Sequence, residues 1–201
     1  MLSRYFVPCH IITKHKAQYN IKLLKGEQTI PQKLSTDQVL GILKKIPMFY
    51  KLNEERIKSI FEICSIKKLA KNDILCHAGD ESNHIYILIA GFLRATLEDG
   101  SKLSRISPLW TIGEMGVFSG EKRSATVIAE SECSLFTIHK ADLFEVFGND
   151  PVIGEQVAIN INRYLAHKLR INQAIIEELK AFCSREEYSR IVDSVMKNLD
   201  T

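Results

Sequence analysis

The sequence predicts a mainly β domain with helices at its ends: an antiparallel β-roll or jelly-roll barrel (a double-stranded β-helix), flanked by N-terminal helices and one long C-terminal helix. Short runs rich in β-branched and aromatic residues, separated by Gly, Asp and Pro, fill the stretch from about 67 to 139. Helical periodicity is confined to the two sides of that stretch. Many short strands gathered in the middle of a chain imply an antiparallel barrel or sandwich.

The first segment, residues 1–34, is predicted to be a basic extension. Met1 to Lys33 contains six Lys or Arg and a single acid, Glu27, whereas the net charge of the whole chain is only +3. Such an arm is either a solvated extension or a docking segment for an acidic partner. A β domain of residues 35–150 and a helical region of residues 151–201 are expected to follow it.

Two helices are predicted before the strands. Ser35-Thr36-Asp37-Gln38 has the form of a capping box, and apolar residues follow it at helical spacing. Asn53 is a candidate N-cap for the second helix. The apolar residues that recur there at helical spacing are Leu52, Ile57, Ile60, Phe61 and Cys64.

Turn residues such as Gly79-Asp80 and Asp99-Gly100 divide the β-rich stretch into short segments. Each segment between such turns has the length and composition of a strand. The predicted strands are Ile85–Ile89, Phe92–Leu97, Leu103–Ile106, Ala125–Ala129 and Ser134–Ile138.

A long helix is predicted from about Val152 to Cys183, after a break at residues 148–151 that places Pro151 in the first turn. Its mostly apolar seam is too long for one small barrel to cover, so part of it is expected to meet a second copy of the chain or a partner protein. Alternatively, it folds back under a last helix, Ser184 to Leu199, which opens with a capping box.

Composition argues against several classes of function. A net charge of +3 is too small to indicate nucleic acid or membrane as the main partner, and no apolar run approaches the ~20 residues of a membrane span. Five cysteines without a C-x-x-C pair suggest reduced thiols and a cytoplasmic location. No catalytic triad order, H-E-x-x-H motif or P-loop is present, so neither an enzyme nor a cofactor or metal site is expected.

Cys76-His77 is the one pair that suggests haem or metal ligation. Adjacent residues on a strand point to opposite faces, so the two side chains would not meet one metal ion. A buried cysteine beside an exposed histidine is the preferred interpretation.

Residues 112–127, IGEMGVFSGEKRSATV, are the most informative stretch. A glycine-rich loop with a short helical turn presents free backbone N–H groups near one arginine, and this combination binds phosphate. Glu114 on the same loop adds an acceptor for a sugar hydroxyl. A phosphate and a ribose held together describe a nucleotide.

These residues closely resemble the phosphate-binding cassette of the cyclic-nucleotide-binding domain family, which includes the bacterial catabolite activator, protein kinase A regulatory subunits and cyclic-nucleotide-gated channels. The resemblance extends from about Ile46 to Ile176. Further segments similar to the family's strand-and-turn signatures, in the same order, are Ile46–Phe49, Ala78–Glu81, Ile85–Gly91 and Glu98–Gly100.

The resemblance implies a pocket for a cyclic mononucleotide, and cyclic AMP is favoured over cyclic GMP as the ligand. Glu114 would accept the ribose 2′-hydroxyl, and Arg123 would pair with the cyclic phosphate. The base would lie against the strand near Leu103 to Ile106 and under the long helix. The remaining implied contacts are the backbone of Gly113, Met115 and Gly116, the hydroxyl and N–H of Ser124, and Tyr164, His167 and Lys168 on the helix.

The chain departs from the family pattern in three places. Asn72 and Leu109 stand where the family usually has turn glycines; Asn tolerates a left-handed conformation but Leu does not, so the approach to the cassette is expected to differ. No DNA-binding domain is expected after the long helix. A signal would therefore pass to a protein partner or change self-association. The alternatives are a nucleotide-free interaction or dimerisation module of the same fold and a haem-based gas sensor.

Overall fold

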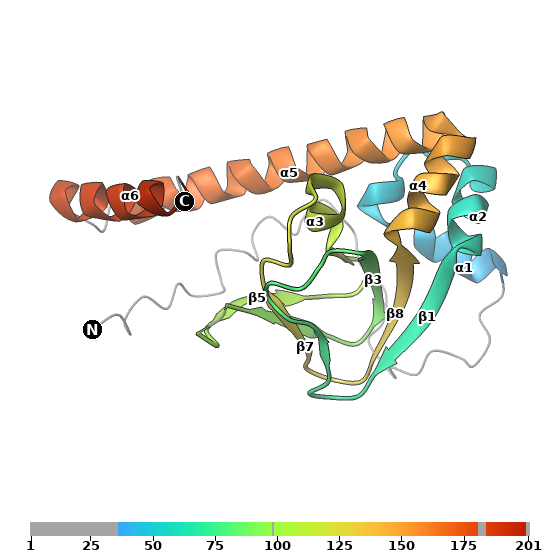
Figure 1. Cartoon of the computed structure of the whole chain (residues 1–201), viewed down its shortest axis with the longest axis horizontal. Coiled ribbons are helices and arrows are strands. Elements are labelled where there is room, and N and C mark those ends of the chain that lie inside the picture. The colour runs from blue at the N-terminus through green and yellow to red at the C-terminus, as the bar shows by residue number, and fades with distance from the viewer. Residues whose placement is uncertain (1–35, 98, 181–183, 200–201) are drawn as a thin grey trace.

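The computed structural model of the chain describes residues 36–97, 99–180 and 184–199 (Figure 1). Two four-stranded antiparallel sheets pack against each other, and helices lie at both ends of the described chain. This confirms the predicted fold class, with two stacked sheets in place of one closed barrel among the described strands. The extension predicted for residues 1–34 and the capping residue Ser35 lie outside the described ranges.

Each sheet combines strands from distant parts of the chain, as in a jelly roll. All six pairings between the described strands are antiparallel. The first sheet has the order β1 (Cys64–Leu69), β8 (Cys133–His139), β3 (His84–Ala90) and β6 (Thr111–Ile112). The second has the order β2 (Ile74–Cys76), β7 (Thr126–Ala129), β4 (Leu93–Thr96) and β5 (Lys102–Ile106).

The helices frame these sheets. Asn53 is the predicted N-cap, since its side chain accepts a hydrogen bond from the Arg56 N–H. The capping box that begins at Ser184 is confirmed too, because Ser184 and Glu187 exchange hydrogen bonds between backbone N–H and side chain. The helices are α1 (Thr36–Leu43), the 3-10 helix η2 (Pro47–Phe49), α2 (Glu54–Glu62), α3 (Glu114–Ser119), α4 (Lys140–Asn149), α5 (Pro151–Lys180) and α6 (Arg185–Leu199).

All five predicted strands are present, as β3, β4, β5, β7 and β8, whereas β1, β2 and β6 were not singled out by the pattern. The assignment of Cys64 to a helical face was wrong. The second helix ends at Glu62, and Cys64 pairs with Ile138 as the first residue of β1. The break predicted at residues 148–151 is also shorter than expected, because α4 continues to Asn149 and α5 begins at Pro151.

The first sheet separates two apolar cores. Alternation along β3 shows this directly: Ile85 and Ile87 belong to the core beneath the helices, whereas Tyr86 and Leu88 belong to the core between the two sheets. The term "inner face" is used below for the face of the first sheet that carries Tyr86 and Leu88. Side chains on that face point into the roll.

Leu109 and Asn72 both adopt left-handed backbone conformations, with φ of 72° and 74°. The expectation that leucine would avoid this conformation was wrong. Two backbone hydrogen bonds hold Leu109 and Trp110 against Leu88 of β3. Leu109 N donates to Leu88 O at 2.7 Å, and Leu88 N donates to Trp110 O at 3.0 Å. These bonds offset a steric cost of about 1–2 kcal/mol for a left-handed leucine.

Helix α5 lies across one end of the roll and continues past α3 (Figure 1). Its proximal part is anchored by Asn160, a buried amide whose Nδ2 donates to the backbone oxygens of Met48 and Tyr50. Its distal part keeps Leu169 63% and Ile176 44% exposed, although α6 is in place. Within the described ranges, no helix has the length and apolar character needed to span a bilayer.

Candidate functional site

The loop between β6 and α3 is built around Gly113. This residue has φ of 86°, a left-handed conformation suited to glycine, and it precedes the first turn of α3. A Cβ added at Gly113 would overlap Nη1 of Arg123. Glycine is therefore required here both by the backbone conformation and by the close approach of the arginine.

Arg123 is held from both its backbone and its side chain. Its N–H donates to Asp80 O, and its carbonyl accepts from the Gly79 N–H, each at 2.8 Å. Nη2 donates to the His84 carbonyl at 2.6 Å. These contacts fix the guanidinium at the end of the roll, beside the loop that contains Gly113.

The Arg123 side chain is only 7% exposed, yet its Nε and Nη1 have no hydrogen-bond partner in the described part of the chain. Buried polar atoms are normally paired, and a charged donor without an acceptor costs free energy. No ion pair joins Arg123 to Glu114 among the described residues, which argues against a salt bridge that closes the cassette on itself. The two unpaired donors suit a compact anion.

The inner face of the first sheet forms the surroundings of this arginine. The Arg123 guanidinium carbon lies 5.5 Å from the centroid of the Tyr86 ring, and the His84 ring stacks on Tyr86 at 5.9 Å. Ser82 Oγ is buried without a hydrogen-bond partner in the described chain, at the point where a Cβ on Gly116 would meet it. Sequence reasoning did not single out Tyr86 or Ser82, although strand alternation is a signal for the direction of Tyr86.

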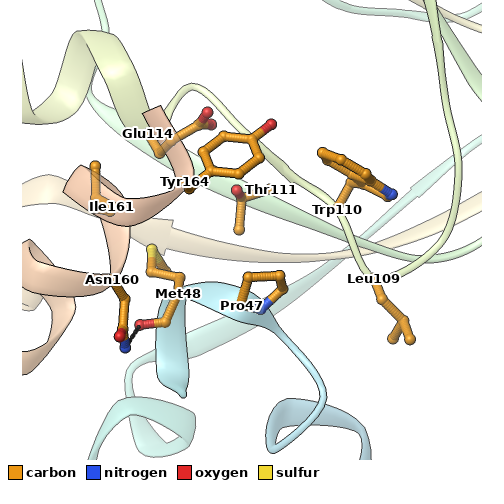
Figure 2. Close-up of a pocket in the computed structure, with 9 residues that line it drawn as sticks. All are labelled: Pro47, Met48, Leu109, Trp110, Thr111, Glu114, Asn160, Ile161 and Tyr164. Carbon is orange, nitrogen blue, oxygen red and sulfur yellow. Dashed lines mark hydrogen bonds between the residues drawn. The ribbon is translucent and has the colours of Figure 1, made fainter. Parts of the chain in front are cut away.

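Glu114 lies against α5, next to Tyr164 (Figure 2). Its side chain is 5% exposed, and burial raises its pKa, against the lowering effects of its own backbone N–H, Lys168 and Arg123. Burial and the nearby Glu114 charge also raise the pKa of Tyr164. Figure 2 shows the Glu114 carboxylate directed toward the Tyr164 ring.

A small cavity of about 20 Å³, enough for about one water molecule, lies where Glu114 meets α5 (Figure 2). Trp110 and Tyr164 meet edge to face across one side of it, with 5.7 Å between ring centroids. Arg123 does not line this cavity. The residues that do are Pro47, Met48, Leu109, Trp110, Thr111, Glu114, Asn160, Ile161 and Tyr164.

The other candidate residues fall into two groups. Met115 and Ser124 are exposed on the cassette loop, whereas Gly116 is buried beneath it. On α5, the Lys168 ammonium lies 4.6 Å from the Tyr164 ring centroid, and His167 is exposed. The structure therefore brings Gly113 and Arg123 together and places Glu114 against Tyr164, but it does not gather all nine candidates around one cavity.

Cys76 and His77 face different surroundings, as predicted. Cys76 is 8% exposed in the core between the sheets, and His77 is exposed. Within the described ranges, no three His, Cys, Asp or Glu side chains come together as a metal site would require.

The middle of the chain resembles several known proteins. Residues 66–150 match the family model of the cyclic nucleotide-binding domain. A cyclic nucleotide-gated potassium channel of Mesorhizobium japonicum is 26% identical over 114 residues, which are 57% of this chain and 31% of that protein. The cAMP-dependent protein kinase regulatory subunit of Yarrowia lipolytica is 27% identical over 110 residues, which are 53% of this chain and 29% of that one. The chain thus spans about a third of the length of these two relatives.

A solved structure supports the same relationship. The N-terminal domain of a transcriptional regulator from Streptomyces coelicolor A3(2) is 27% identical and superposes with a TM-score of 0.57, covering 63% of this chain and 94% of that one. The stretch that the family model matches, residues 66–150, includes both Gly113 and Arg123. Residues 66–150 therefore belong to the cyclic nucleotide-binding domain family.

Proposed function

We propose that the roll binds a cyclic mononucleotide, with cyclic AMP preferred over cyclic GMP, and that the chain acts as a sensor and not as an enzyme. The observation that carries this proposal is the buried Arg123 guanidinium, whose Nε and Nη1 lack partners in the described chain and whose Nη1 lies against Gly113. A cyclic phosphate supplies acceptor oxygens and a negative charge, so it would form charge-assisted hydrogen bonds with those two donors. The name of the Yarrowia relative agrees with cyclic AMP as the first ligand to test.

The remaining contacts follow from the position of the cassette. The ribose 2′-hydroxyl would donate to Glu114, and the backbone of Gly113, Met115 and Gly116 would shape the loop around the sugar and phosphate. Ser124, exposed next to Arg123, would add a hydroxyl and an N–H to the phosphate. No cofactor or metal is part of this proposal.

Helix α5 is the proposed lid. Tyr164 lies against Glu114 (Figure 2), so a ribose bound at that carboxylate would lie next to α5 and shift its preferred position. Lys168 and His167, one turn further along the helix, would then face the base. Only a ligand that contacts α5 differently in two positions of the helix transmits a signal.

The output of the proposed sensor is a protein partner or a second copy of the chain. Leu169 and Ile176 are exposed on the distal part of α5. This observation also favours the second candidate function, a nucleotide-free interaction module. Sedimentation velocity with and without cyclic AMP separates the two, because a ligand-dependent change in association supports the sensor and an association indifferent to nucleotide supports the module.

Calorimetry with cyclic AMP and cyclic GMP tests the binding proposal. Arg123→Ala is compared with Lys122→Ala, a change at the exposed neighbouring cation. Removing one partner of a buried charge pair costs at least about 2 kcal/mol, so affinity should fall roughly 30-fold or more in Arg123→Ala and stay unchanged in Lys122→Ala. Equal affinity in the two variants would remove Arg123 from the site.

A thermal-shift measurement complements this comparison. A ligand at one hundred times its dissociation constant stabilises a folded protein by about 2.7 kcal/mol. No shift of the wild-type chain with either cyclic nucleotide would contradict the sensor and leave the interaction module.

A further inference from the structure

Tyr86 lies between two positively charged side chains at one end of the roll. The Arg123 guanidinium carbon is 5.5 Å from the centroid of its ring, and the Lys67 ammonium is 5.7 Å from the same centroid. Arg123 belongs to the cassette, whereas Lys67 belongs to β1. Two cations from distant parts of the chain thus converge on one aromatic ring.

The register of β1 explains why Lys67 reaches this ring. Lys67 pairs with Leu135, and Leu69 pairs with Cys133. Leu69, Leu135 and Cys133 all belong to the core between the sheets, so alternation along β1 places Lys67 on the inner face as well. Its neighbour Lys68 has the opposite direction and is exposed.

Among the described residues, no acid forms an ion pair with the Lys67 ammonium. Its side chain is half-buried, and in the described part of the chain it makes no ion pair or hydrogen bond. Lys44 and Lys102, in contrast, each pair with a glutamate at the surface. A partly desolvated ammonium that contacts only an aromatic ring is stabilised further when an anion approaches it.

The neighbouring groups are also donors. Thr137 pairs with Tyr86 across the ladder between β8 and β3, and its Oγ is buried without a hydrogen-bond partner among the described residues. Asp80, an acid whose charge acts on Tyr86, already accepts the His77 N–H at 2.7 Å. Burial and the nearby His139 lower the pKa of His84, and Arg123 and Lys67 add to this effect, as expected where positive charge accumulates.

We infer that Lys67 is a second cation for the phosphate of the bound ligand, acting from the β1 side of Tyr86 while Arg123 acts from the cassette. This inference rests on the proposed function and adds a binding residue to it. The flexible four-carbon stem lets the ammonium follow a phosphate without movement of the strand. The ammonium thereby strengthens both the affinity for the phosphate and its dependence on salt.

Lys67→Met removes the charge and keeps the length of the side chain, and Lys68→Met makes the same change on the opposite face of the strand. Calorimetry with cyclic AMP and cyclic GMP is performed at low and at high salt. We expect about tenfold weaker binding and a smaller salt dependence in Lys67→Met, as for the loss of one charge-assisted contact. Lys68→Met and the conservative Lys67→Arg should stay within about twofold of the wild type.

Equal affinities in Lys67→Met and Lys68→Met would overturn the inference, because a lysine that only packs on Tyr86 affects stability and not phosphate binding. Melting of the ligand-free variants shows whether both fold. Lys67→Gln serves as the second neutral variant if the methionine is not tolerated.

Inorganic phosphate separates failure of this inference from failure of the proposed function. If the wild-type chain binds neither cyclic nucleotide, the proposed function is wrong, and thermal stabilisation by phosphate then decides the role of Lys67. Stabilisation that is lost in Lys67→Met and kept in Lys68→Met supports the inference. No stabilisation of the wild type, or equal stabilisation of both variants, contradicts it.

Discussion

The ring of Trp110 meets the ring of Tyr164 edge to face, at an interplanar angle of 62° (Figure 2). Trp110 directly precedes β6, the strand that leads into the cassette, and Tyr164 lies on α5. The pair therefore connects the proposed binding loop to the proposed lid. Trp110 is still 45% exposed, so the contact can open without exposing a deep core.

Trp110→Ala should loosen α5. An aromatic pair of this geometry contributes about 1 kcal/mol beyond the area it buries, so local opening of the helix near Tyr164 should become roughly fivefold more frequent. Hydrogen exchange of the amides at residues 161–168, measured by mass spectrometry, checks this. Tyr50→Ala, at an aromatic residue that is 57% exposed, is the control, and equal exchange in the two variants would disprove the connection.

Gly113→Ala should abolish nucleotide binding and also destabilise the fold. The left-handed φ costs an alanine about 1–2 kcal/mol, and the added Cβ displaces the Arg123 guanidinium. Gly100→Ala is the matched control, because Gly100 also has a left-handed φ, of 79°, but a Cβ there meets no atom within 4 Å. Chemical denaturation should show a loss of stability in both variants, larger in Gly113→Ala because of the added overlap with Arg123, and calorimetry should show lost affinity in Gly113→Ala alone. A Gly113→Ala protein that binds as well as Gly100→Ala would refute the assigned geometry.

Glu114→Gln should change how stability depends on pH. Burial raises the folded-state pKa of Glu114 above its ordinary value of 4.5, so the fold favours the protonated carboxyl. The stability contributed by that protonated form is fully present below the ordinary pKa and is lost as the pH rises through the raised folded pKa. A glutamine at this position does not titrate, so it contributes the same stability across this pH range.

The wild-type chain should therefore lose unfolding free energy relative to Glu114→Gln as the pH rises above 4.5 and through the raised pKa of the folded state. Urea denaturation across this range, without nucleotide, measures the difference. Glu121→Gln, at an exposed acid of the same loop, is the control. A difference that stays constant with pH, or that favours the wild type as the pH rises, would show that Glu114 is not held in a desolvated environment.

Local patterns in the sequence were sufficient to predict much of the fold. Alternation and turn residues located β3, β4, β5, β7 and β8, and helical periodicity located α5, because strand and helix formation depend mainly on neighbouring residues. The short strands β1, β2 and β6 were not singled out, since too few residues carry their pattern. At Leu109 the local preference gave the wrong prediction. The leucine side chain disfavours the left-handed conformation, but hydrogen bonds between this segment and the backbone of Leu88 hold it there.

Part of the candidate site could also be predicted from the sequence, and part of it could not. The order of Gly113, Glu114 and Arg123 along the chain indicated a phosphate-binding loop, because such a loop is a local structure with its own sequence pattern. No local sequence pattern predicts that Glu114 lies against Tyr164 or that Lys67 lies against Tyr86, because these contacts join residues far apart in the chain.

The sequence by itself determined that strands lie between helices and that one loop pairs glycine backbone with an arginine, because these features are encoded within short segments. Only the tertiary structure decided which charges converge. Lys67 and Arg123 meet at Tyr86 because strand register and sheet pairing turn both side chains into the roll. That convergence depends on contacts between residues far apart in the chain, and folding alone brings them together.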